Sequence, residues 1–157
     1  MIRENYPDKM TVSKGYFSYT DNDRHNCVFF SADSVPKITI SIGFDDTFLF
    51  ETAVVDTTAR EMTSLENDLY TIRQKAIAES VNDTVVFKHY TNTNLNYIPL
   101  IVGKEKKVYI LTGTNTNGLV IFGNDYLITF DKKNRIKSKK GLHKNIIPIE
   151  YGDNTDV

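Results

Sequence analysis

The sequence predicts an α+β fold, with one long central helix, about residues 57–81, packed on a bent and mainly antiparallel β-sheet. Only this stretch has the length and apolar spacing of a long helix. The segments on both sides of it are short β-rich runs separated by turn residues, so we expect strands before and after the helix to form the sheet. Strands and helices do not alternate along the chain, which argues against a parallel sheet.

The predicted helix has one apolar side. Its apolar residues recur at spacings of three and four, which places them on one face of a cylinder: Met62, Leu65, Leu69, Ile72 and Ala76. Thr58 and Glu61 fit a capping box, in which each side chain satisfies a backbone N–H at the first turn. This pair therefore marks the predicted start of the helix.

The segments that flank the helix are predicted to be strands joined by turns. Before the helix we expect an arm over residues 1–10, a turn at 21–23, and an antiparallel meander of strands at 11–19, 27–30, 37–44 and 48–56. After it we expect a loop at 91–96, a polar tail at 152–157, and strands at 84–90, 98–102, 107–112, 119–122, 126–130, 135–139 and 145–151. Pro99 places the strand at 98–102 at an edge of the sheet.

The length and composition are those of one globular domain, and we expect a single domain over residues 1–157. No stretch approaches the ~20 apolar residues of a membrane span, and the polar first residues lack a signal-peptide pattern. A lone cysteine, Cys27, fits a reducing compartment, so a cytoplasmic location is expected. A processed secreted protein, or a fragment of a longer chain, would have the same features.

No motif specifies a reaction. The sequence contains no G-x-S-x-G or H-E-x-x-H and no glycine-rich phosphate loop. The candidate catalytic residues are therefore only the histidines and the cysteine, namely His25, Cys27, His89 and His143. Cys27 leads into Val28-Phe29-Phe30, so a small buried core residue is the competing interpretation.

Asp21, Asp23 and His25 superficially match the start of a calcium loop. The match fails at Asn26, where a glycine is needed, and at Ala32, where a glutamate is needed. We therefore expect a solvated turn, with no metal site and no cofactor.

Two other groups of residues could bind a ligand or partner. Four tyrosines could line a pocket, although aromatic residues in a small domain are first of all core material: Tyr90, Tyr97, Tyr109 and Tyr126. Arg135, Lys137 and Lys139 would share one face of a strand and could contact anions or an acidic partner. Lysines on an edge strand also prevent aggregation, which is the competing interpretation.

We expect a non-enzymatic binding or protein-interaction domain whose partner is another protein or a second copy of the chain. The alternative is a small-molecule hydrolase with a histidine-containing pocket between helix and sheet. The acidic total charge and the lack of aromatics among the lysines disfavour nucleic acid, and no membrane contact is expected. The sequence leaves open whether the protein is an enzyme.

Overall fold

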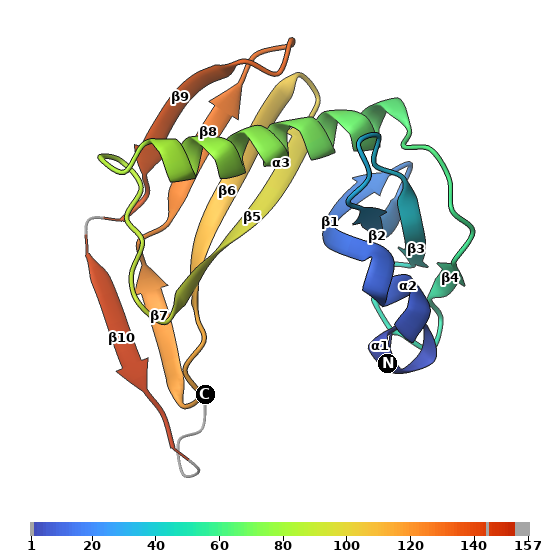
Figure 1. Cartoon of the computed structure of the whole chain (residues 1–157), viewed down its shortest axis with the longest axis horizontal. Helices are drawn as coiled ribbons and strands as arrows, with labels where there is room; N and C mark the ends of the chain where they lie inside the picture. The colour runs from blue at the N-terminus through green and yellow to red at the C-terminus, as the bar shows by residue number, and fades with distance from the viewer. Residues whose placement is uncertain (1, 144, 153–157) are drawn as a thin grey trace. The chain divides into compact units, whose positions relative to one another are not determined.

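The structure, a computed structural model, describes residues 2–143 and 145–152. It has an α+β architecture of mainly antiparallel sheets and one long helix (Figure 1). The elements follow in the order α1 (Ile2–Asn5), α2 (Pro7–Val12), β1 (Ser13–Asp21), β2 (Arg24–Ser31), β3 (Ile38–Phe44), β4 (Val54–Asp56), α3 (Ser64–Asn82), β5 (Thr93–Val102), β6 (Glu105–Thr114), β7 (Leu119–Gly123), β8 (Tyr126–Phe130), β9 (Ile136–Gly141) and β10 (Ile146–Glu150).

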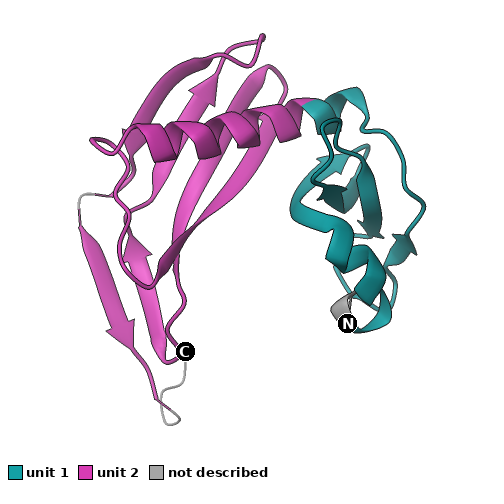
Figure 2. Cartoon of the chain, in the orientation of Figure 1, with its two compact units in different colours: residues 1–67 teal, residues 68–157 magenta. Residues whose placement is uncertain are grey.

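The chain divides into two compact units, residues 1–67 and residues 68–157 (Figure 2). The boundary falls inside α3, so the first turn of this helix belongs to unit 1 and the remainder to unit 2. The single domain expected over residues 1–157 stays a prediction.

Unit 1 is built on an antiparallel sheet with the strand order β1-β2-β3-β4. The predicted turn after β1 is confirmed: Asn22 and Asp23 both have positive φ, as a two-residue type I′ hairpin requires. Two predictions are corrected. The expected arm contains the short helices α1 and α2, and most of the strand expected at 48–56 is a loop, with only Val54–Asp56 paired to β3.

The core of unit 1 follows the predicted strand pattern. The alternating isoleucines of β3 are almost completely buried, and they are joined by apolar residues of β1 and β2: Phe17, Val28, Phe30, Ile38, Ile40 and Ile42. Period-2 alternation in a β-branched run therefore identified the three buried isoleucines of this strand, although Thr39 on the other face is buried as well.

The helix begins later than predicted, at Ser64. Residues 57–63 are not helical because Arg60 exchanges backbone hydrogen bonds with Ile38 at 2.8 and 3.0 Å, which extends the sheet by one bridge. A second T-x-x-E match, Thr63 and Glu66, forms the capping box: the Thr63 N–H donates to Glu66 Oε2 at 2.8 Å and the Glu66 N–H to Thr63 Oγ1 at 3.2 Å. The sequence thus contained two matches, and tertiary pairing of Arg60 decides between them.

Unit 2 packs α3 on an antiparallel sheet with the strand order β5-β6-β8-β9 (Figure 1). The predicted apolar side of the helix is confirmed at Leu69, Ile72 and Ala76, which are buried. The core combines residues of the helix, of the segment that follows it and of the sheet: Ile72, Ala76, Phe87, Val108, Ile110, Tyr126, Ile128 and Phe130.

Three further predictions are corrected in this region. Within the described residues, no strand of unit 1 pairs with a strand of unit 2, so the single sheet expected from both flanks of the helix is wrong. Residues 84–90 form a turn and an irregular segment, because Asp83 Oδ1 accepts the N–H groups of Val85 and Val86. Most of the predicted loop at 91–96 belongs to the long edge strand β5.

The predicted strands around residues 119–122 and 145–151 are present as β7 and β10, which pair antiparallel in a two-stranded ribbon. Gly123 ends β7 with a φ of +94°, and a side chain there would collide with the carbonyl of Asn145. Of the predicted tail at 152–157, residues 153–157 lie outside the described residues.

Candidate functional site

One face of the β7–β10 ribbon is apolar and exposed. Phe122 lies opposite Ile147, and Val120 lies opposite Ile149, so these four side chains share a face. Phe122 and Ile147 are each 56% exposed, and Ile149 is 49% exposed. We call this surface, made of Val120, Phe122, Ile147 and Ile149, the ribbon face. It carries no charged side chain.

The ribbon also has free edges. Within the described part of the chain, β7 and β10 pair only with each other, so each strand has one edge that is not hydrogen-bonded to another strand. An isolated two-stranded ribbon is marginally stable in water, and an unpaired edge can accept a further strand. The ribbon therefore combines two features of a docking surface.

A histidine and a carboxylate meet beside the ribbon. Asp125, between β7 and β8, lies with Oδ2 3.1 Å from Nδ1 of His143. The Thr112 N–H donates to Asp125 Oδ1 at 2.9 Å, and the Asp125 carbonyl accepts the Leu142 N–H at 2.7 Å. This contact is an ion pair when the ring is protonated, and Nε2, the second ring nitrogen, has no hydrogen-bond partner among the described residues.

A buried and uncharged network lies beneath this pair. Tyr126 donates its hydroxyl hydrogen to Asn124 Oδ1 at 2.5 Å and accepts the Lys88 N–H at 2.8 Å. The Asn124 amide donates to the Lys88 carbonyl at 3.1 Å and to Thr112 Oγ1 at 2.9 Å. Burial raises the pKa of Tyr126 first of all. These bonds attach the segment after α3 to β6 and β8.

Two hollows adjoin His143. The smaller, about 190 Å³, is lined by residues of the segment after α3, of β8 and of the chain from β9 to β10: Val86, Lys88, Tyr90, Asn124, Tyr126, Gly141, His143, Asn145 and Ile146. The larger, about 400 Å³, is lined mainly by Phe122, Leu142 and Ile147, with Asp125 and His143 at its polar side. Among the described residues of either lining there is no serine, threonine or cysteine that could act as a nucleophile.

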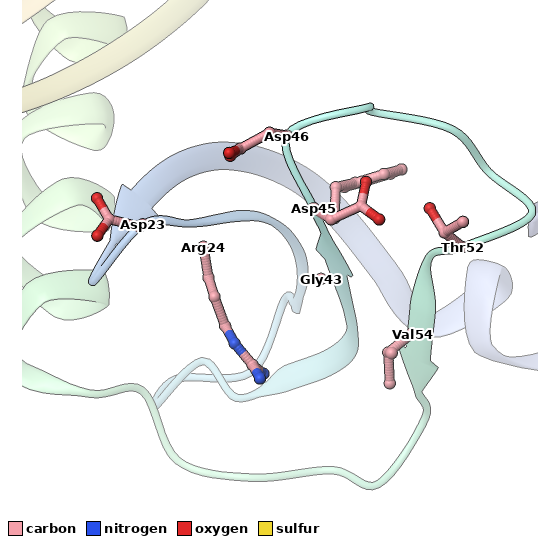
Figure 3. A pocket seen from close by; sticks show the side chains of 8 residues that line it. Asp23, Arg24, Gly43, Asp45, Asp46, Thr52 and Val54 are labelled. Atoms are coloured by element: carbon pink, nitrogen blue, oxygen red, sulfur yellow. The ribbon is translucent and has the colours of Figure 1, made fainter.

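A third hollow, about 350 Å³, lies in unit 1 between β2, the loop after β3 and β4 (Figure 3). Asp45 and Asp46 come from the loop and Arg24 from β2. The carboxylate of Asp45 is hydrogen-bonded within its own loop: Oδ1 accepts the Thr47 N–H at 3.0 Å and the Thr47 hydroxyl. These hydrogen bonds from Thr47 lower the pKa of Asp45.

The four predicted catalytic candidates do not form one group. His25 contacts Thr20 at 2.9 Å and Asp46 at 3.3 Å, with its ring against Phe48. Cys27 lies two residues further along β2, and burial raises the pKa of its thiol, against a hydrogen bond from Ser18 that lowers it. His89 donates from Nε2 to the Ser80 carbonyl at 3.0 Å.

His143 is therefore the one candidate that lies against a carboxylate and lines a hollow of unit 2. Its partner Asp125 was missed, because it lies in the short connection between the strands predicted at 119–122 and 126–130 and was given no role there. Gly123 and Asn124 have positive φ, as turn residues do, and this turn places the carboxylate of Asp125 next to the ring of His143.

Two of the four predicted ligand-binding tyrosines, Tyr90 and Tyr126, line the smaller hollow. Tyr97 instead packs against the core, with its hydroxyl 2.6 Å from the Ser80 hydroxyl. Tyr109 lies half-buried on β6, on the face opposite the core residues Val108 and Ile110.

Two of the three residues predicted to contact anions, Arg135 and Lys139, are paired with acidic side chains of the same chain. Lys139 contacts Glu79 and Asp83, each at 2.5 Å, and Arg135 contacts Asp131 at 2.7 Å. Lys137 is exposed on β9, which lies at an edge of the sheet as expected.

Among the described residues, no group of three histidine, cysteine or acidic side chains could hold a metal ion. None of the helices in the described ranges is both long and apolar enough to cross a membrane. Comparison with known proteins found no matching family model, no matching curated protein and no matching solved structure.

Proposed function

We propose that the chain is a non-enzymatic protein-interaction domain whose docking surface is the ribbon face, and that its partner is a second copy of the chain. One observation carries this proposal: an apolar and uncharged face stands about half exposed on a ribbon of only two strands. Burying such a face releases about 25 cal/mol per Å² of apolar area, and its burial would stabilise the ribbon itself.

The chemistry of the face favours a second copy as the partner. A two-fold interface brings the same patch of both subunits together, so the patch must be complementary to itself. The ribbon face meets this condition because it carries no charge that would repel its copy. Its four apolar side chains, Val120, Phe122, Ile147 and Ile149, would form the centre of the interface.

The test is the mass of the full chain in solution, measured by light scattering and sedimentation over a range of concentrations. The wild type is expected to dimerise, and Ile149→Lys to weaken dimerisation at least tenfold, because two buried ammonium groups would face each other across the interface. Far-UV circular dichroism checks that the variant folds, and Ile149→Thr provides a second variant that keeps β propensity.

Ile98→Lys is the matched control. Ile98 is 46% exposed on the edge strand β5, so the same change is made at nearly the same exposure outside the ribbon face. A wild type that is strictly monomeric at millimolar concentration, or equal weakening by Ile98→Lys, would contradict the proposal.

The hydrolase alternative is favoured by a different observation, the carboxylate of Asp125 against His143. In that function Nε2 would act as a general base on water, since the hollows lack a serine, threonine or cysteine nucleophile. Ester hydrolysis that is abolished by His143→Gln and unaffected by Ile149→Lys would favour this alternative.

A further inference from the structure

The smaller hollow beside His143 has a basic lining residue, Lys88. Among the described residues that line it there is no aspartate or glutamate, whereas Asp125 lines the larger hollow. Lys88 Nζ donates to the Thr84 carbonyl at 2.8 Å, which uses one of its three hydrogens. An anion in the hollow would therefore meet charge of opposite sign.

Some polar groups of the hollow are already hydrogen-bonded within the protein and form its floor, and others remain available to a ligand. Both amide hydrogens of Asn124 and the hydroxyl of Tyr126 are already used within the protein. Four polar groups of the lining residues have hydrogen-bonding capacity left for a ligand: Lys88 Nζ, His143 Nε2, the Tyr90 hydroxyl and the Asn145 amide. The floor is thus fixed, and a ligand would have to use some of these four groups.

Size and apolar lining restrict the ligand further. The hollow measures about 190 Å³, which is roughly six times the share of volume of one water molecule. Val86 and Ile146 contribute apolar surface beside the donors. A short hydrocarbon chain with one anionic group fits this combination, whereas a doubly charged phosphate would be repelled more strongly by the nearby Asp125.

We propose that this hollow binds a short-chain monocarboxylate, with Lys88 and the ring of His143 on the carboxylate and Val86 and Ile146 on the hydrocarbon chain. Asp125, whose Oδ2 lies 3.1 Å from Nδ1 of His143, is a positioning residue for that ring. The site differs from the ribbon face, although His143 also lines the larger hollow together with Phe122 and Ile147 of that face.

The experiment is a titration of the full chain with butyrate, followed by amide shifts in NMR spectra at constant ionic strength. We expect saturable shifts at Lys88, Tyr90 and Asn145, and at least fivefold weaker binding for Lys88→Met and for His143→Gln. Lys88→Met keeps the backbone N–H that Tyr126 accepts, so the floor of the hollow is preserved. Lys140→Met, at an exposed position on β9, is the matched control and should bind butyrate as the wild type does.

Two comparison compounds separate the contributions of charge and shape. Butanol, which lacks the charge, and inorganic phosphate, which lacks the hydrocarbon chain, are both expected to bind at least fivefold more weakly than butyrate. Equal binding of phosphate would replace the carboxylate assignment with an unselective anion site and overturn the proposal. Saturable shifts that are absent, or lost equally in Lys140→Met, would overturn it as well.

Discussion

Each unit of the molecule has a buried polar cluster: the one around Glu66 in unit 1 is charged, and the one around Asn124 and Tyr126 in unit 2 is not. In unit 1, Glu66 is fully buried and accepts hydrogen bonds from Nη1 and Nη2 of Arg60 and from the hydroxyl of Tyr19, each at 2.7 Å. In unit 2, Asn124 and Tyr126 satisfy each other and the backbone of Lys88 without any ionised group.

This difference in charge indicates what each cluster does. The charged cluster connects β1, the extended segment before the helix and the first turn of α3, and a buried charge of this kind is stable only while every partner is present. The uncharged cluster connects the segment after α3 to the sheet and forms the floor of the hollow beside His143. The cluster around Glu66 should therefore be sensitive to pH and to charge, and the cluster around Tyr126 to the loss of single hydrogen bonds.

Loss of the buried carboxylate is expected to have the largest effect. Glu66→Ala should lower the free energy of unfolding by about 3–5 kcal/mol, because the partly buried guanidinium of Arg60 loses its partner. The matched control is Glu61→Ala, which removes the other glutamate that fits a capping box in the sequence. Its ion pair with Lys37 is exposed, so the loss of unfolding free energy should stay below about 1 kcal/mol. Urea unfolding followed by circular dichroism measures both variants.

Hydrogen exchange of the same variant tests whether the two units unfold separately. If they do, Glu66→Ala should lower protection of amides in β2 and β3 and leave that of β6 and β8 unchanged. Equal loss in both sheets would instead support one cooperative domain over residues 1–157. A similar cost for Glu66→Ala and Glu61→Ala would contradict the structural role of the charged cluster.

Acid is expected to remove a contribution of about 3 kcal/mol from the same cluster. Burial alone raises the pKa of Glu66, but hydrogen bonds from Arg60, the Thr63 N–H and Tyr19, with the charge of Arg60, lower it from 4.5 to about 2. Because the pKa is lower in the folded state, this stabilisation is complete above about pH 4.5 and is lost as the pH falls towards about 2.

Glu66→Gln isolates this contribution, since other acids also titrate in the same range. The difference in unfolding free energy between wild type and Glu66→Gln should shrink steadily between about pH 5 and about pH 2. A difference that does not depend on pH would show that Glu66 is not ionised in the folded protein.

The strands of unit 1 and the apolar side of α3 were predictable from local patterns, because alternation in β3 and helical spacing at Leu69, Ile72 and Ala76 survive folding. The start of the helix was not predictable from such a pattern. Thr58-x-x-Glu61 and Thr63-x-x-Glu66 are equivalent as sequences, and only the pairing of Arg60 with Ile38 makes the second one the cap. Long-range backbone pairing cannot be inferred from one segment alone.

The candidate sites were predictable only in part for the same reason. His143 was identified by residue type, but the turn containing Asp125 carries no local signal that it faces a histidine eighteen positions further on. The ribbon face was hidden because β7 was expected to join its neighbours in one sheet, whereas it pairs with β10. Period-2 patterns give the face of a side chain and do not give the partner of its strand.

The smallest effect is expected in the uncharged cluster. Tyr126→Phe should cost about 1–3 kcal/mol, because the buried Asn124 Oδ1 and the Lys88 N–H each lose a partner. Tyr109→Phe is the control: it removes the same hydroxyl from the outer face of β6 and should change stability by less than about 0.5 kcal/mol. The cost of Tyr126→Phe should also be the same at about pH 7 and about pH 3, because none of the groups it leaves unpaired is ionised. A cost that grows or shrinks with pH would mean that a charged group takes part in the cluster, and the contrast between the two units would then fail.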